Sequence, residues 1–107
     1  MISLYKILES EVRNKKSIYL YKENDILWKA YEHSAYILSK IFPDFLVKNE
    51  VVDLNFILCT AMVDIRKMKD LMTGTALNFH DDCLEIVTNY KYKEEDFIVW
   101  KSTLPED

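Results

Sequence analysis

Apolar positions recur along the chain at spacings that predict most of its elements. Residues 17–22 are dense in β-branched and aromatic side chains and predict a strand. Residues 23–25 follow as a turn, and Asn24 or Asp25 is suited to cap the next element. Before this strand, residues 2–13 predict an amphipathic helix, because apolar side chains lie three and four positions apart. Those side chains are Leu4, Tyr5, Leu8 and Val12.

A second amphipathic helix is predicted over residues 26–41. Pro43 ends it, because proline lacks the backbone N–H that an α-helix needs. Residues 45–52 are compatible with a short hairpin or with a strand and a loop. The side chains that share one face of the predicted helix are Leu27, Ala30, Tyr31, Ser34, Leu38 and Ile41.

The period of the pattern changes in the second half of the chain. Residues 55–59 form a short uncharged run and predict a buried strand. A helical period follows from Thr60, and Gly74 stands where a helix C-cap glycine belongs. Residues 76–80 and 83–88 predict two strands that are joined by a turn at Asp81 and Asp82. The side chains on one face of the third predicted helix are Met62, Ile65, Met68 and Met72.

The last predicted element is a short helix that begins at Glu94. Acidic residues stand at its start and Lys101 near its end, which suits the helix dipole. The predicted order is therefore helix, strand, helix, strand, helix, strand, strand, helix. It favours a single α/β domain over residues 1–107, with helices packed on a small mixed sheet. The apolar residues of the last helix are Phe97, Trp100 and Leu104.

Composition narrows the class of protein. The net charge is −4 and the isoelectric point is about 5.2, which disfavours autonomous DNA binding because that binding depends on Lys and Arg. Two cysteines without close spacing do not suggest a disulfide framework. The longest uncharged runs have ten residues, whereas a membrane span needs about 20. Charged residues interrupt the N-terminal apolar stretch too early for the core of a signal peptide. We therefore expect a cytoplasmic protein without a membrane partner.

No residue spacing in the chain predicts catalysis. The run from His80 to Cys83, with Glu85 nearby, contains potential metal ligands, but ligands adjacent on a turn reach one ion poorly. Cys59 lies in an apolar run typical of a buried thiol, and His33 is typical of a packed or surface histidine. Residues 94–96 are explained by the start of a helix. We therefore expect no enzyme, no metal, no cofactor and no small-molecule ligand.

The stretch from Ile18 to Trp28, continued by Ala30, Tyr31 and Glu32, resembles the N-terminal, mismatch-recognition domain of the MutS DNA mismatch-repair family. That family opens with a short helix, an apolar strand that ends in Tyr-Arg, a Gly-Asp-Phe-Tyr-Glu turn and an Ala-rich helix. The strand end is similar to Tyr21-Lys22 here, and the turn Asp to Asp25. The resemblance covers about a third of the chain. It implies a fold similar to the MutS N-terminal domain, with the segment after Cys59 laid loosely over that domain's second strand–helix unit.

The residues that recognise a mismatch in that family are replaced in this chain. The family wedges the Phe of the turn against the base, and the Glu two positions later accepts a hydrogen bond. Ile26 and Trp28 stand at these positions, and Asn24 replaces the turn glycine. Gly74 is the single glycine of the chain, so a Gly-rich phosphate-binding loop is impossible. The resemblance therefore implies a fold and not mismatch recognition.

Aromatic and basic side chains supply the predicted contact residues. Tyr19 and Tyr21 share a strand face, and residues 90–93 alternate tyrosine with lysine, a pattern that suits base stacking or a protein interface. Charged helix faces are otherwise simply solvated. We expect a non-catalytic binding module that engages a protein partner or self-associates; the alternative is weak, sequence-nonspecific DNA association. The predicted contact residues are Lys22, Asn24, Trp28, Arg66, Lys67, Lys69, Tyr90 and Tyr92.

Overall fold

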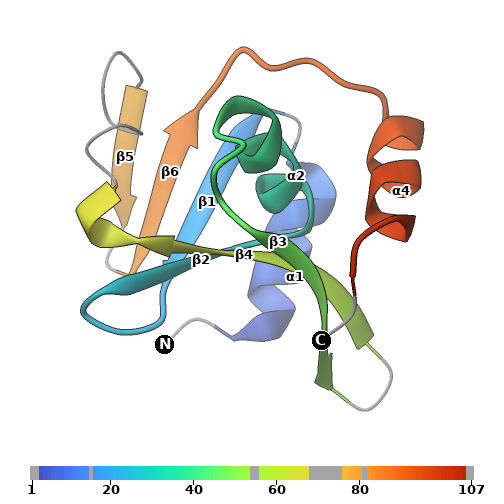
Figure 1. The fold of residues 1–107 in the computed structure, drawn as a ribbon. Coiled ribbons are helices and arrows are strands. Elements are labelled where there is room, and N and C mark those ends of the chain that lie inside the picture. Colours follow the sequence, from blue (N-terminus) through green and yellow to red (C-terminus); the bar gives the residue numbers. More distant parts are fainter. Residues whose placement is uncertain (1–2, 15, 54–55, 68–75, 81, 106–107) are drawn as a thin grey trace.

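Six strands form one sheet in the order β3-β4-β2-β1-β6-β5, and all five of the pairings in this described sheet are antiparallel (Figure 1). The computed structural model describes residues 3–14, 16–53, 56–67, 76–80 and 82–105. The predicted α/β class is confirmed, although the described sheet is antiparallel rather than mixed. The elements are α1 (Leu4–Arg13), β1 (Ser17–Lys22), β2 (Leu27–Tyr31), α2 (Glu32–Ile41), β3 (Val47–Asp53), β4 (Phe56–Asp64), the 3-10 helix η1 (Ile65–Lys67), β5 (Ala76–His80), β6 (Cys83–Val87) and α4 (Glu94–Ser102).

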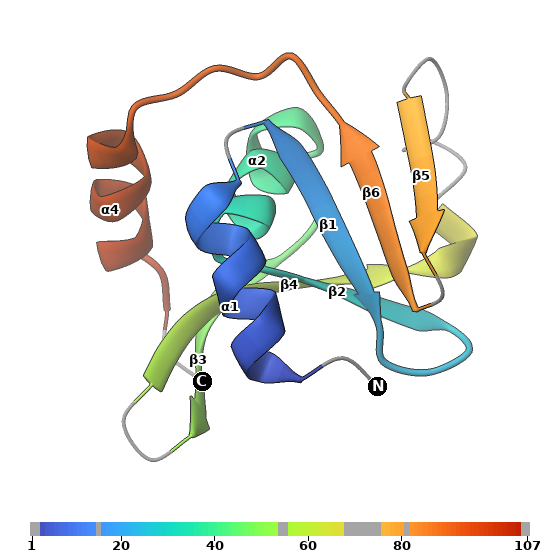
Figure 2. The same cartoon turned by 180° about the vertical axis from the view of Figure 1, so that it is seen from behind.

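Helices lie on both faces of the sheet, and α1 and α2 also contact each other directly. α1 lies on one face, whereas α2 and α4 lie on the other (Figures 1 and 2). The side chains of the core on the α2 side are Ile18, Leu20, Trp28, Ala30, Ala35, Tyr36, Ile37, Leu38, Val47, Cys59, Ala61, Val63, Leu84, Ile86 and Phe97. Those of the smaller core under α1 are Ile7, Tyr21, Tyr31, Leu58 and Cys83. Because both faces of the central strands are covered, these strands lack a simple alternation of apolar and polar residues.

Five elements stand where the sequence predicts them: α1, β1, β5, β6 and α4. Ser3 caps α1, because its Oγ accepts the backbone N–H of Lys6 at 3.3 Å. Three acidic residues occupy the first turn of α4, where the helix dipole favours negative charge. The sequence was compatible with either a short hairpin or a strand and a loop over residues 45–52. These residues lie largely in the single strand β3.

The helix predicted over residues 26–41 is wrong in its first part, because residues 27–31 form strand β2. Asn24 is the cause: its Oδ1 accepts the backbone N–H groups of Ile26 at 2.8 Å and of Leu27 at 2.9 Å. These bonds close a tight turn that returns the chain along β1. Asn24 therefore serves a hairpin and not a helix cap.

Burial on both faces explains why β2 imitates a helix. Trp28 and Ala30 pack in the core on the α2 side, whereas Tyr31 packs under α1. As a result, the apolar residues of β2 and those of α2, which begins at Glu32, recur at intervals of three and four residues, as they would along one continuous helix. Periodicity alone therefore cannot separate this strand from the helix that follows.

The helix predicted from Thr60 is also wrong over residues 60–64, because β4 continues to Asp64. β4 pairs with β3 on one side and with the whole of β2 on the other, from Tyr31 opposite Thr60 to Leu27 opposite Asp64. These long-range pairings, and not a local preference, set the length of β4. Residues 68–75, with Met68, Met72 and Gly74, lie outside the described residues.

Candidate binding cleft

Two of the four cations predicted as contact residues, Lys22 and Arg66, are paired with nearby carboxylates. Lys22 Nζ lies 3.8 Å from Asp25 Oδ1 in the β1–β2 turn. Arg66 Nε donates to Asp64 Oδ1 at 3.0 Å, and this contact with Arg66 lowers the pKa of the Asp64 carboxyl to about 2. The register of β2 and β4 brings this turn and η1 to the same end of the sheet (Figure 1). Lys67 is exposed there, and Lys69 lies outside the described residues.

The aromatic members of the predicted contact set are not free surface anchors. Trp28 is 6 % exposed and packs in the core, so its ring has no surface to offer a partner. Tyr90 and Tyr92 are half-buried, and their rings stack with centroids 6.0 Å apart. Both rings also contact Tyr36 of α2, at 6.2 and 4.9 Å between centroids. They pack against the core that contains Tyr36 of α2 and Phe97 of α4.

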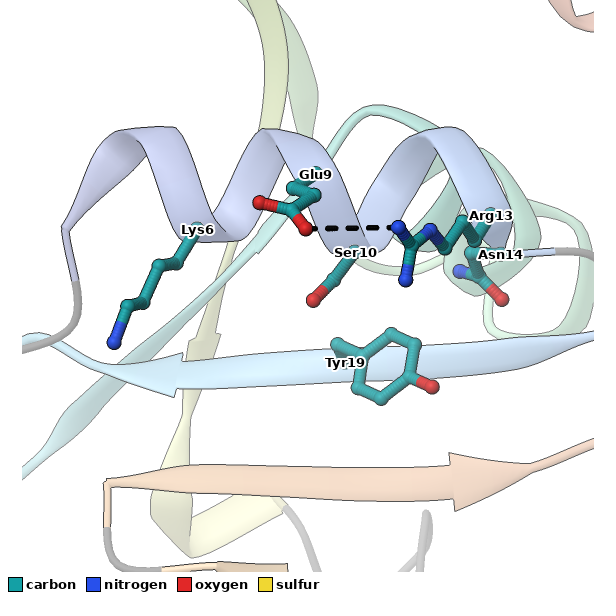
Figure 3. A pocket seen from close by; sticks show the side chains of 6 residues that line it. All are labelled: Lys6, Glu9, Ser10, Arg13, Asn14 and Tyr19. Atoms are coloured by element: carbon teal, nitrogen blue, oxygen red, sulfur yellow. Dashed lines mark ion pairs between the residues drawn. The ribbon is translucent and has the colours of Figure 1, made fainter.

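A polar groove of about 410 Å³ runs between α1 and β1 (Figure 3). Lys6, Glu9, Ser10 and Arg13 lie along one side of α1, and the Tyr19 ring faces them from β1 (Figure 3). Arg13 Nη2 lies 3.6 Å from Glu9 Oε1 in an exposed pair, which contributes little energy. Glu9 compensates Arg13, and the charged side chains along this side of α1 are exposed, as is typical of a solvated helix face.

A second cavity, of about 300 Å³, has apolar walls and a charged base. It lies between the other side of α1, the start of β4, the N-terminus of α2 and the side chain of Lys101 from α4; we call it the α1–α4 cleft. The walls include Val12, which is 74 % exposed, and Ile57, which is 44 % exposed. The complete lining is Leu8, Glu11, Val12, Glu32, His33, Ile57, Leu58 and Lys101.

Glu11 is a buried carboxyl at the base of the cleft, and 2 % of it is exposed. Its oxygens accept three donors: the Ser34 N–H at 2.8 Å, the Ser34 hydroxyl, and Asn14 Nδ2 at 3.4 Å. Burial nevertheless raises the pKa of Glu11 to about 8, because desolvation outweighs these donors and the nearby Glu32 adds repulsion. The carboxyl ties α1 to the first turn of α2.

Glu32 joins three elements beside Glu11. Its Oε1 lies 2.8 Å from Lys101 Nζ of α4, and its Oε2 accepts the Cys59 backbone N–H of β4 at 2.9 Å. Its backbone has a φ of 50°, in the left-handed region that is unfavourable for a residue with a side chain. The chain accepts this conformation at the junction of β2 and α2, where it turns directly from strand to helix.

His33 connects the cleft to α4. Its Nε2 lies 2.9 Å from each carboxylate oxygen of Glu94, and its ring stacks on Phe97 with centroids 4.1 Å apart. The sequence left open whether this histidine is packed or on the surface, and the structure shows a packed one. The pair fixes the start of α4 against the start of α2.

The described residues offer neither an activated thiol nor a metal centre. Cys59 and Cys83 are buried and free. Burial raises the pKa of both thiols, that of Cys83 to about 11, so neither is a thiolate at neutral pH. The described residues contain no group of three His, Cys, Asp or Glu side chains placed to hold a metal ion. Among them there is also no helix with the length and apolarity to cross a membrane.

Glu11, Glu32 and Lys101 are the cleft residues that the sequence did not indicate. One signal was available: Glu11 lies three residues after Leu8 and four after Ile7, on the side of the predicted helix that should be apolar. An acidic residue at such a position is either paired inside the fold or functional. No comparable signal marks Glu32 or Lys101, because their proximity depends on the tertiary structure.

No protein-family model, no curated protein and no solved structure matches this chain. The resemblance to the MutS N-terminal domain therefore stays a prediction. Function has to be argued from the cleft itself.

Proposed function

We propose that this protein is a non-catalytic module that binds a protein partner through the α1–α4 cleft. The observation that carries this proposal is the incomplete burial of the apolar side of α1. Leu8 is partly buried in the core under α1, whereas Val12 and Tyr5 are 74 and 77 % exposed. Tyr5 and Val12 are seven residues apart, so they lie on the same side of the helix, two turns apart. The fold thus leaves uncovered an apolar strip that it does not use itself.

The chemistry of the cleft suits a protein interface. Apolar side chains of α1 and β4 line its walls, and fixed charged groups line its base. Protein interfaces combine such an apolar centre with polar groups that determine register. Exposed apolar surface next to a concavity marks sites of protein interaction.

The same geometry favours binding over catalysis. Ser34 and Asn14 hold the Glu11 carboxyl, while Lys101 and the Cys59 N–H hold that of Glu32. These contacts fix the start of α2 and explain both carboxyl groups without a substrate. A nucleophile with a lowered pKa does not line the described cleft.

The two other surfaces predicted from the sequence carry less support. Tyr90 and Tyr92 are engaged with Tyr36, and the cations Lys22 and Arg66 are paired with neighbouring aspartates. Weak DNA association through these cations stays a prediction. In the alternative of self-association, a second copy of this chain would cover the same exposed strip of α1.

Affinity capture with matched variants tests the proposal. The wild-type protein, Val12→Lys and Leu46→Lys are each used as bait, and captured proteins are quantified by mass spectrometry. Val12 and Leu46 are both exposed, but Leu46 does not line the cleft. We expect at least one partner that is lost with Val12→Lys and retained with Leu46→Lys. Identical capture by all three baits would contradict the proposal, as would loss with both variants.

A further inference from the structure

We infer that the outer edge of strand β5 pairs with β5 of a second copy of this chain, so that two sheets join across a two-fold axis at Asn78. This inference goes beyond the proposed function and does not rest on it. The α1–α4 cleft includes residues of β4, beside one edge of the sheet, whereas β5 forms the opposite edge (Figure 1). The direction of the β5 backbone groups, the absence of edge protection and the order of its side chains carry the inference.

The hydrogen bonds of β6 show which backbone groups of β5 face outward. In an antiparallel ladder the N–H and C=O of one residue face the same neighbouring strand, and successive residues alternate between neighbours. The Lys22 N–H of β1 donates to the C=O of Asp82, directly before β6, at 2.8 Å. Asp82 therefore faces β1. By alternation Cys83 and Glu85 face β5 on the other side of β6.

The outward-facing backbone groups of β5 are those of Leu77 and Phe79. Glu85 is the register partner of Asn78, so the N–H and C=O of Asn78 bond to β6. The groups of the two neighbouring residues point to the other side, away from β6. Outside the β5–β6 ladder, these two residues make no backbone hydrogen bond to other described residues. Such a row of donors and acceptors is matched by another extended strand.

The two edges of the sheet are protected unequally. Strand β3, at the other edge, carries charged side chains, and its register with β4 shifts between Val51 and Asp53. Its Asn49 N–H also donates to the Pro105 C=O at 2.8 Å. Charges, bulges and covering segments are the features that prevent an edge strand from pairing with another chain. Strand β5 contains no Lys, Arg, Asp, Glu or Pro, and its described register with β6 has no shift.

The occupant is a second copy because β5 is complementary to itself. Antiparallel pairing about Asn78 places Leu77 opposite Phe79 of the second copy, and Phe79 opposite its Leu77. Outward-facing residues then meet each other in both pairs, and each pair exchanges both N–H···O bonds. The Phe79 side chain, 59 % exposed, contacts the aliphatic Leu77 side chain, which packs against the core on the α2 side. Aromatic and aliphatic side chains in directly opposite positions stabilise a strand pair.

The charge distribution also favours this strand for contact between copies. The net charge of the chain is −4, so two copies repel each other overall. An edge without Lys, Arg, Asp or Glu brings the copies together without placing like charges opposite each other. The contact is limited to one short strand, so we expect a weak dimer that depends on protein concentration.

Sedimentation equilibrium of the full chain tests the pairing. We expect the monomer mass of 12.8 kDa at about 5 µM and a rise toward twice that mass at about 500 µM. Phe79→Lys should weaken the dimer by about tenfold or more, because a lysine on an edge strand opposes pairing. Val51→Lys on β3 is the matched control, since Val51 is also 59 % exposed, and it should dimerise like the wild type. A wild type that stays monomeric at about 1 mM, or equal effects of the two variants, would overturn the inference.

Cysteine cross-linking tests the register. Asn78 meets Asn78 of the second copy in a non-hydrogen-bonded pair, with Cα atoms about 4.5 Å apart, which a disulfide can bridge. His80 lies opposite residue 76 of the second copy, so the two His80 positions are about 13 Å or more apart. Under mild oxidation, Asn78→Cys should therefore form dimers at least about tenfold faster than His80→Cys. The native Cys59 and Cys83 are buried. Equal rates for the two variants would contradict the register.

The other occupants of this edge give different results. If Asn78→Cys forms a disulfide with another protein in a lysate while the purified wild type stays monomeric, the edge accepts a foreign strand and the inference is wrong. If Val12→Lys abolishes the dimer and Phe79→Lys does not, self-association uses the exposed strip of α1, which also overturns it. Partner capture that depends on Val12 is a separate measurement, so the proposed function stands or fails independently.

Discussion

At the scale of single residues, Glu11 is the position at which this fold departs most from a simple core. It lies on the buried side of α1, beside Ile7, yet it carries an ionisable group. Its three donors come from Ser34 and Asn14, and no basic side chain donates to it among the described contacts. Desolvation therefore controls its pKa, with a consequence for stability that can be measured.

Glu11 should make the free energy of unfolding fall as pH rises. A glutamate in the unfolded chain loses its proton near pH 4.3, whereas the folded protein keeps it until about pH 8. The folded state thus binds more protons between these values, and its stability decreases by up to about 1.4 kcal/mol per pH unit. Denaturant unfolding of the wild type and of Glu11→Gln, from pH 5 to pH 8, measures this slope.

The difference between those two proteins is the decisive quantity. Glu11→Gln should gain stability relative to the wild type as pH rises, whereas Glu9→Gln on the exposed side of α1 should follow the wild type. Parallel curves for Glu11→Gln and the wild type would show that Glu11 is already ionised in the folded protein.

The exposure of individual residues on α1 was only partly predictable from the sequence. The spacing of Leu4, Tyr5, Leu8 and Val12 correctly indicates a helix with an apolar side. In the structure the buried centre of that side is Ile7, while Tyr5 and Val12 are exposed. Periodicity gives the direction of an apolar strip but not how much of it the sheet covers.

At the scale of elements, the junction of β2 and α2 concentrates several constraints. The chain passes from Tyr31 at the end of the strand to Glu32 at the start of the helix without a linker. Glu32 has a left-handed backbone, and its carboxyl reaches both β4 and α4. Contacts of the side chain therefore hold a backbone conformation that a non-glycine residue disfavours.

At position 32, the glycine variant should be more stable than the alanine variant, which is the reverse of the usual order in a helix. Glu32→Ala removes the partner of Lys101 and of the Cys59 N–H, at a cost of about 2–4 kcal/mol. Glu32→Gly loses the same contacts but relieves the left-handed backbone, so it should be about 1 kcal/mol more stable than Glu32→Ala. In an ordinary helix position, glycine is the less stable of the two. Chemical denaturation of both variants measures the order, and a less stable Glu32→Gly would contradict it.

The sequence predicted the elements with a clear local period better than those whose pattern mixes two faces. β5, β6 and α4 show clear local periods and lie where those periods place them. β2 and the second half of β4 are central strands with both faces covered, and their patterns imitate helices. Their pairing with each other, set by residues about 33 positions apart along the chain, is not encoded in any short window.

At the scale of the whole molecule, the α1–α4 cleft depends on elements from both ends of the chain. Val12 comes from the first helix, Ile57 from a central strand and Lys101 from the last helix. The sequence could therefore predict neither the cavity nor the neighbourhood of Glu11 and Glu32. The prediction of a non-catalytic binding module stays a prediction, and the structure moves the proposed surface from the tyrosines to this cleft.

Photo-crosslinking from within the cleft tests the central claim most directly. A benzoyl-phenylalanine is placed at position 12 or, as the matched control, at position 46; both native residues, Val12 and Leu46, are exposed. After irradiation in cells, crosslinked products are identified by mass spectrometry. We predict a specific protein adduct from position 12 that is absent from position 46. The same adducts from both positions, or none from position 12, would contradict the assignment of this cleft as a partner-binding site.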